Sequence, residues 1–264
     1  MSALSELVPA RAAGWTAGLG NMLAKEHGVW WRTRRWLVHL LLWMVVINGF
    51  LLLVNLSDSG DAGPRALQKL PELIEVFFRV GGFFATVGVV TVTQSVIVQE
   101  RQLGTAAWIL TKPLARPAVV VAKLLVTAYA VLFLMVLVPT TLLCLQTRLV
   151  FGEWPPMPGF LAGLGLLVLS HLFYVALTVM LGTLFNSRGA VSGTAIGFMF
   201  AGMILPNFLK GAPKFFPWML PEFGAALALG KELPPWWQWP VVTSVVWIGL
   251  FVALAIWRFG REEF

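Results

Sequence analysis

Cysteine and charged residues are both scarce in this sequence. Its 264 residues include one cysteine, and only 12% of them are charged. A lone Cys144 cannot form a disulfide within the chain, so a disulfide-stapled domain is excluded and the redox compartment stays undetermined. Hydrophobic residues make up 58% of the chain, which includes 13 tryptophans. This composition excludes a water-soluble domain and predicts an all-α membrane protein that crosses the bilayer several times.

The sequence also lacks the common signatures of catalysis, nucleotide binding and metal binding. It contains no GxxxxGK[ST] phosphate loop, no HExxH or GxSxG motif and no paired-cysteine spacing. We therefore expect no enzymatic activity, and no metal or cofactor bound directly by the chain. Of the three histidines, only His171 lies in the middle of an apolar run. It is either a neutral imidazole satisfied by a neighbouring helix or a ligand for substrate or metal.

Six apolar runs are long enough to cross the membrane, because a bilayer core of about 30 Å requires roughly 20 residues of helix. An even number of spans places both termini on the same side. The first run is as long as a full span and precedes no small-residue cleavage site, so we expect it to stay in the mature chain. The predicted spans cover residues 36–56, 76–98, 118–145, 160–185, 190–209 and 239–258.

The distribution of basic residues predicts which side the termini occupy. With both termini inside, 12 of the 19 lysines and arginines fall on the cytosolic side, and the net charge of +7 lies entirely there. Cytosolic segments are enriched in lysine and arginine, so we predict a cell-membrane protein with both termini in the cytosol. Attraction to anionic membrane lipids explains the basic surplus, and no nucleic-acid partner is expected.

A polar segment at 100–117 separates the second and third apolar runs. Its charges and prolines exclude it from hydrocarbon, and its middle part has the pattern of a short amphipathic helix. It reads Glu-x-x-x-Gly-Thr at 100–105 and Lys-Pro-x-x-Arg at 112–116, followed by Lys123 in the next run. This sequence pattern resembles the cytosolic loop of type-2 ABC transporter permeases, where the loop contains the coupling helix that docks on an ATPase subunit.

The resemblance extends over essentially the whole chain and implies a type-2 ABC permease architecture. The chain would form the translocation path of an exporter, pair with an identical or related permease subunit, and bind two copies of a separate ATPase, where ATP and magnesium would bind. Glu100 would face the ATPase or orient the coupling helix, and Arg116 would fix the exit of this helix at the membrane surface. Gly104 and Thr105 would shape its start. The residues implied in ATPase coupling are Glu100, Arg101, Gly104, Thr105, Lys112 and Arg116.

Residues 15–35, ahead of the first span, form an amphipathic stretch rich in tryptophan and arginine. Such a stretch is expected to lie in the headgroup layer with its tryptophans inserted. The simpler interpretation is a positive flank that orients the first span. A Lys-Glu pair followed by a basic cluster resembles the amphipathic connecting helix of the same permease family.

Two spans carry patterns that indicate contacts with other helices. Thr91, Gln94 and Ser95 share one face of the second span, so they either form interhelical hydrogen bonds or line a translocation path between two permease subunits. Gly189, Gly193 and Gly197 repeat at four-residue spacing in the fifth span. This ladder of small residues predicts close approach by another helix, from this chain or from a second copy.

Residues 206–238 alternate prolines with large aromatic residues. We predict an extracellular re-entrant segment with a short helix at about 217–230, because tryptophan at this density is typical of a membrane boundary. Three lysines in this segment form a solvated rim or attract an anionic or lipidic cargo: Lys210, Lys214 and Lys231. Glu75 and Arg79, one helical turn apart, are predicted to anchor the outer end of the second span, the alternative being a ligand for a transported ion.

Two other functions are compatible with the sequence. A non-transporting membrane scaffold or signalling anchor would need no ATPase and would tolerate loss of the 100–117 segment. An intramembrane enzyme would have to use His171. The cargo of a transporter is not specified, although the absence of a charged row within the spans favours an amphipathic or apolar molecule.

Overall fold

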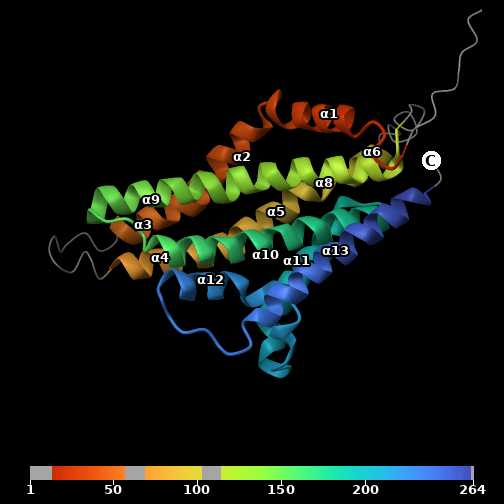
Figure 1. The fold of residues 1–264 in the computed structure, drawn as a ribbon. Coiled ribbons are helices and arrows are strands. Elements are labelled where there is room, and N and C mark those ends of the chain that lie inside the picture. The colour runs from red at the N-terminus through yellow and green to blue at the C-terminus, as the bar shows by residue number, and fades with distance from the viewer. Residues whose placement is uncertain (1–13, 57–68, 103–113, 263–264) are drawn as a thin grey trace, which may run out of the picture.

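A computed structural model describes residues 14–56, 69–102 and 114–262 of the chain, apart from the side chains of 54–56 and 101. All regular structure in these ranges is helical, with no strand (Figure 1). Six helical stretches in this part are long and apolar enough to cross a membrane, as predicted. They are Arg35–Leu53, Lys69–Glu100, Arg116–Phe151, Met157–Leu184, Arg188–Phe208 and Gln238–Gly260.

The second and third spans are longer than predicted. The second begins at Lys69, seven residues before its predicted start at 76; Pro71 lies in the first helical turn, where its missing N–H leaves no hydrogen bond broken. The third continues to Phe151 and stops at Gly152, which has a left-handed φ of 73°. At about 1.5 Å per residue both helices are about 50 Å long, so their ends extend beyond a hydrocarbon core of about 30 Å.

Short π-helical segments interrupt the first three spans without breaking them. The first span consists of α2 (Arg35–Trp43), η1 (Met44–Gly49) and α3 (Phe50–Leu56), and the second of α4 (Lys69–Val80), η3 (Gly81–Ala85), α5 (Thr86–Thr93) and α6 (Ser95–Gln102). The third consists of α8 (Arg116–Leu132), η4 (Phe133–Leu137) and α9 (Val138–Phe151). The other three are α10 (Met157–Leu184), α11 (Arg188–Phe208) and α13 (Gln238–Gly260).

The fourth span, α10, is the central helix of the bundle. In its most apolar window 72% of the residues are buried, against 17% in the first, fifth and sixth spans. It packs against α5, α11, α13 and the short helix α12 (Leu220–Ala228). The peripheral spans expose large apolar side chains, among them Val38, Leu53, Met203 and Val242. Such surfaces suit contact with lipid tails or other membrane helices.

The segment predicted as re-entrant contains two 3-10 turns, Ala212–Lys214 and Pro217–Met219, followed by α12. The short helix predicted at about 217–230 is therefore confirmed, and Figure 1 shows α12 beside α10 and α4. Contact with α10 is close at Gly163, where an added Cβ would overlap the carbonyl oxygen of Gly224. The extracellular position of this segment stays a prediction.

An ion-pair network fixes the chain after α12 to the start of the second span. The Glu75 carboxylate accepts a hydrogen bond from Arg79 Nη2 at 2.6 Å, which is the predicted pair. It accepts a second hydrogen bond from Lys231 Nζ at 3.1 Å. Lys231 was predicted to belong to a solvated rim or to attract a cargo. The Lys231 side chain is 57% exposed while it pairs with Glu75 of α4, so a contact with α4 is added and both interpretations stay predictions.

Candidate functional site

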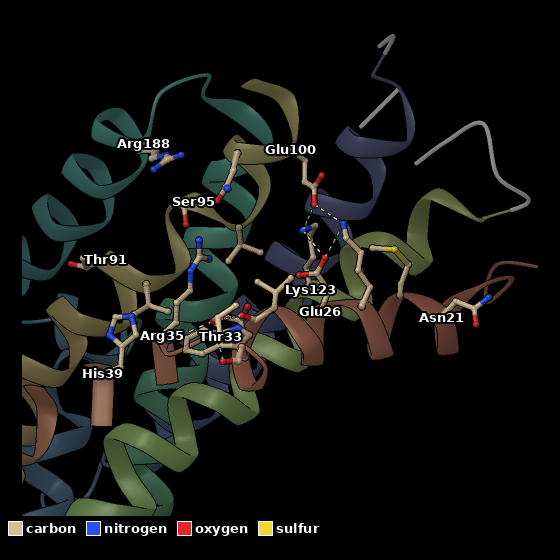
Figure 2. A pocket seen from close by; sticks show the side chains of 18 of the residues that line it. Asn21, Glu26, Thr33, Arg35, His39, Thr91, Ser95, Glu100, Lys123 and Arg188 are labelled. Atoms are coloured by element: carbon tan, nitrogen blue, oxygen red, sulfur yellow. Dashed lines mark hydrogen bonds and ion pairs between the residues drawn. The ribbon is translucent and has the colours of Figure 1, made fainter. Parts of the chain in front are cut away.

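Four charged side chains from three helices meet at one end of the bundle (Figure 2). Helix α1 (Leu19–Trp31) packs along α8 and supplies Lys25 and Glu26. Lys123 of α8 places its Nζ 2.9 Å from Glu26 Oε1 and 3.0 Å from Glu100 Oε1, at the end of α6. Lys25 Nζ lies 2.9 Å from Glu100 Oε1. We call these four residues the ion cluster.

The ion cluster is balanced in charge and largely buried. Exposed side-chain fractions are 4% for Lys123, 10% for Glu26 and 15% for Glu100, whereas Lys25 is 41% exposed. Burying charges is costly, so such a cluster is stable only while each charge keeps its partners. Because its members come from α1, α6 and α8, the cluster fixes α1 to the helices on both sides of residues 103–113.

A second contact fixes the same helices where the chain enters α8. The backbone N–H of Ala115 donates to the Ala17 carbonyl at 3.0 Å. Leu114 packs onto Gly18, which ends the segment before α1 with a left-handed φ of 74°. Glycine adopts this conformation without strain and leaves room for the leucine side chain. The start of α1 is therefore attached directly to the residues that follow 103–113.

Replacing Gly18 with alanine should weaken this attachment. The new Cβ would require a strained backbone and would overlap Leu114 Cδ1, with an expected cost of about 1–2 kcal/mol. Gly20→Ala is the matched control, because no atom lies within 4 Å of its added Cβ. Thermal unfolding in detergent should show a lower midpoint for Gly18→Ala alone. Equal midpoints for the two variants would contradict this account.

Arg116 connects the start of α8 to the end of the last span. Its Nη1 donates to the carbonyls of Gly260 at 2.7 Å and Glu262 at 2.9 Å. A cation is favourable at a helix C-terminus, where unpaired carbonyls carry partial negative charge. At the end of α6, Gln102 Nε2 donates to the Asn186 carbonyl in the turn between α10 and α11 at 3.3 Å. Both ends of the 103–113 segment are thus bound to other helices of the bundle.

The structure describes only some of the residues that the resemblance implies in ATPase coupling. Gly104, Thr105, Lys112 and the side chain of Arg101 lie outside the described residues. Glu100 is described, and its carboxylate accepts from two lysines of the same chain. The two roles implied for Glu100, facing an ATPase and orienting a coupling helix, both stay predictions. Sequence reasoning noted Lys25, Glu26 and Lys123 but could not pair them, since a residue in α1 and one in α8 are brought together only by the fold.

A cavity of about 1060 Å³ adjoins the ion cluster between α1, α2, α5, α6, α8 and the start of α11 (Figure 2). Its lining includes Thr91 and Ser95 from the predicted polar face, whereas Gln94 is half-buried outside the lining. The Thr91 hydroxyl donates to the Val87 carbonyl of its own helix at 2.8 Å, so this bond is not interhelical. The lining also includes Trp30, Arg35, His39, Val92, Val96 and Arg188.

His171 lies apart from this cavity in the core of α10. It is completely buried, and its Nδ1 is 2.7 Å from the Leu167 carbonyl one turn earlier. The His171 Nδ1 therefore bonds to the backbone of its own helix, and not to the predicted partner on a neighbouring helix. Among the described residues, no group of three His, Cys, Asp or Glu side chains is placed to hold a metal ion.

The predicted glycine ladder lies on the outer surface of α11. Gly189, Gly193 and Gly197 are exposed, and an added Cβ at each would meet no atom within 4 Å. No helix of the described chain therefore covers these three positions. A contact with a second copy or a related chain stays a prediction.

Comparison with known proteins gives one family. No curated protein matched the chain. A family model described as "Protein of unknown function (DUF2705)" matches residues 41–264. The match covers all six spans except the start of the first, and so includes Glu100, Lys123 and Arg116, but not α1 with Lys25 and Glu26. Because this match extends over most of the chain, the chain belongs to the DUF2705 family.

Proposed function

We propose that the chain is the membrane-spanning permease subunit of an ABC exporter, coupled to a separate ATPase through residues 100–117. One observation carries this proposal: both ends of the 103–113 segment are bound to other helices of the bundle. Before the segment, Glu100 binds the lysines of α1 and α8. After it, Ala115 binds the segment before α1 and Arg116 binds the end of α13.

These contacts have a mechanical consequence. A segment attached by flexible links would absorb a displacement imposed by a partner protein. A displacement imposed on Glu100 and Ala115, which flank 103–113, would move α1, α8 and the end of α13 together, because buried ion pairs and backbone bonds resist separation. The chain shows no phosphate loop of its own. We therefore propose that a partner that binds and hydrolyses ATP with magnesium supplies the force.

A complete transporter of this type contains two permease chains and two ATPase subunits. The uncovered glycine face of α11 supports a second permease chain, identical or related, because small residues let two helices approach closely in a membrane. The basic residues at the ion-cluster end support a cytosolic position for this end and for both termini in the cell membrane. The N-terminal helix α1 would lie in the inner headgroup region, beside the part of α8 that extends beyond the hydrocarbon.

Co-purification tests the proposal. The tagged full chain, extracted from its native membranes in mild detergent, should retain an ABC-type ATPase in equal amount. Charge reversal at Lys112 together with Thr105→Arg should release the ATPase, because both positions belong to the coupling segment. Lys210→Glu, an exposed reversal at the other end of the bundle, is the control and should retain it.

The outcomes separate the two candidate functions. If the wild-type chain retains no ATPase, the permease function is wrong and a membrane scaffold or signalling anchor takes its place. If the coupling-segment variant retains as much ATPase as Lys210→Glu, docking through 100–117 is wrong. Normal membrane insertion of each variant is checked by its yield and its gel-filtration profile.

A further inference from the structure

The cavity beside the ion cluster has an excess of positive charge. Lys25 and Lys123 are neutralised by Glu26 and Glu100 within the ion cluster. The cavity also contains Arg35 and Arg188, and neither guanidinium pairs with a carboxylate in the described part of the chain. In Figure 2 the two arginines lie apart from the ion cluster.

Each of these arginines is the first residue of a helix. Arg35 begins α2 and Arg188 begins α11, and neither helix has an acidic residue in its first turn. A helix N-terminus carries partial positive charge from its unpaired N–H groups, so a cation there is electrostatically unfavourable. An anion in the cavity would reverse this effect, because guanidinium groups and helix N-termini both bind phosphate oxygens.

The rest of the lining suits an apolar group attached to the anion. Val92, Val96 and Trp30 contribute apolar surface to the cavity. His39 lies one helical turn beyond Arg35, inside the first span, so the cavity continues from the polar end of this span into its apolar part. A lipid bound here would place its phosphate beside the arginines and its acyl chains toward the exposed apolar side chains of α2.

We infer that this cavity binds an anionic amphiphile with a phosphate headgroup, whose oxygens pair with Arg35 and Arg188. The inference deepens the proposed function and rests on it in one respect: in a transporter, such a molecule would be the cargo. Binding itself requires neither an ATPase nor transport. It can therefore be measured on the chain alone.

The test is native mass spectrometry of the purified full chain in detergent, with phosphatidylglycerol as the probe. Phosphatidylcholine with the same acyl chains is the zwitterionic comparison. The wild-type chain should bind phosphatidylglycerol at least about tenfold more tightly. Arg35→Gln with Arg188→Gln should weaken this binding about 100-fold, because each charge-assisted contact contributes roughly tenfold.

A second double variant controls for general attraction between a basic surface and an anion. Arg32→Gln with Arg34→Gln removes the same charge immediately before Arg35, at positions outside the cavity lining. Its affinity should change less than about threefold. Equal weakening in both double variants, or no weakening in Arg35→Gln with Arg188→Gln, would overturn the inference.

Two further measurements complete the test. Without lipid, Arg35→Gln with Arg188→Gln should unfold at the wild-type temperature or above it, because it removes unfavourable charge from two helix N-termini; this result excludes misfolding as the cause of lost binding. Inorganic phosphate should not displace phosphatidylglycerol at equal concentration. Displacement by phosphate alone would overturn the assignment to an amphiphile. Neither result depends on whether the chain retains an ATPase.

Discussion

Replacing Lys123 with methionine is expected to lower the free energy of unfolding by about 3–5 kcal/mol. Lys123 is 4% exposed and is bonded to Glu26 and Glu100, which are 10% and 15% exposed. Methionine preserves the volume of the side chain but removes the charge. Two buried carboxylates then face each other with only the half-exposed Lys25 as a counter-ion. The midpoint of thermal unfolding in detergent measures the loss.

Two matched variants isolate the cause. Lys25→Met removes a lysine of the same cluster that is 41% exposed, and its cost should stay below about 1 kcal/mol. Glu26→Gln combined with Lys123→Met leaves the Lys25–Glu100 pair in balance, so it should be more stable than Lys123→Met alone. If the double variant is as unstable as the sum of its single variants, an uncompensated carboxylate is not the reason for the loss.

The six spans were predictable from the sequence because the length of an apolar run determines whether a helix can cross the bilayer. Their ends were less predictable. The second span begins seven residues earlier than predicted, since Pro71 and Glu72 belong to the first turn of α4, where proline is tolerated and an acidic residue is favourable. The third span ends six residues later than predicted, after Arg148. Polar residues near a membrane surface therefore do not mark where a helix stops.

The site was predictable only in part. The motif around Glu100 indicated where a functional segment lies, and this residue does participate in the ion cluster. The partners in α1 could not be predicted, because Glu26 and Lys123 are 97 positions apart in sequence. Lys25 and Glu26 alone predict only a polar helix face. Their pairing depends on how α1 packs against α8, which no local pattern specifies.

The same limit applied to α12, whose place against α10 depends on glycines at the contact, among them Gly163 and Gly224. Small residues let helices in a membrane approach until their backbones touch. An added Cβ at Gly163 would overlap the Gly224 carbonyl oxygen, and one at Gly224 would lie 2.8 Å from the Gly163 carbonyl oxygen. Both neighbours are backbone atoms, so a rotamer change cannot relieve the overlap. Any larger residue at 163 must displace α12 as a whole.

We therefore expect Gly163→Ala to cost about 1–3 kcal/mol and to loosen the segment that Lys231 binds to Glu75. Gly165→Ala is the control on the same helix, since no atom lies within 4 Å of its added Cβ, and it should be neutral or slightly stabilising. Thermal unfolding in detergent gives the stability, and limited proteolysis after Lys231 reports the loosening. If Gly163→Ala matches Gly165→Ala in both measurements, close backbone contact does not hold α12 against α10. Faster cleavage in Gly163→Ala alone would show that α12 depends on this contact for its position.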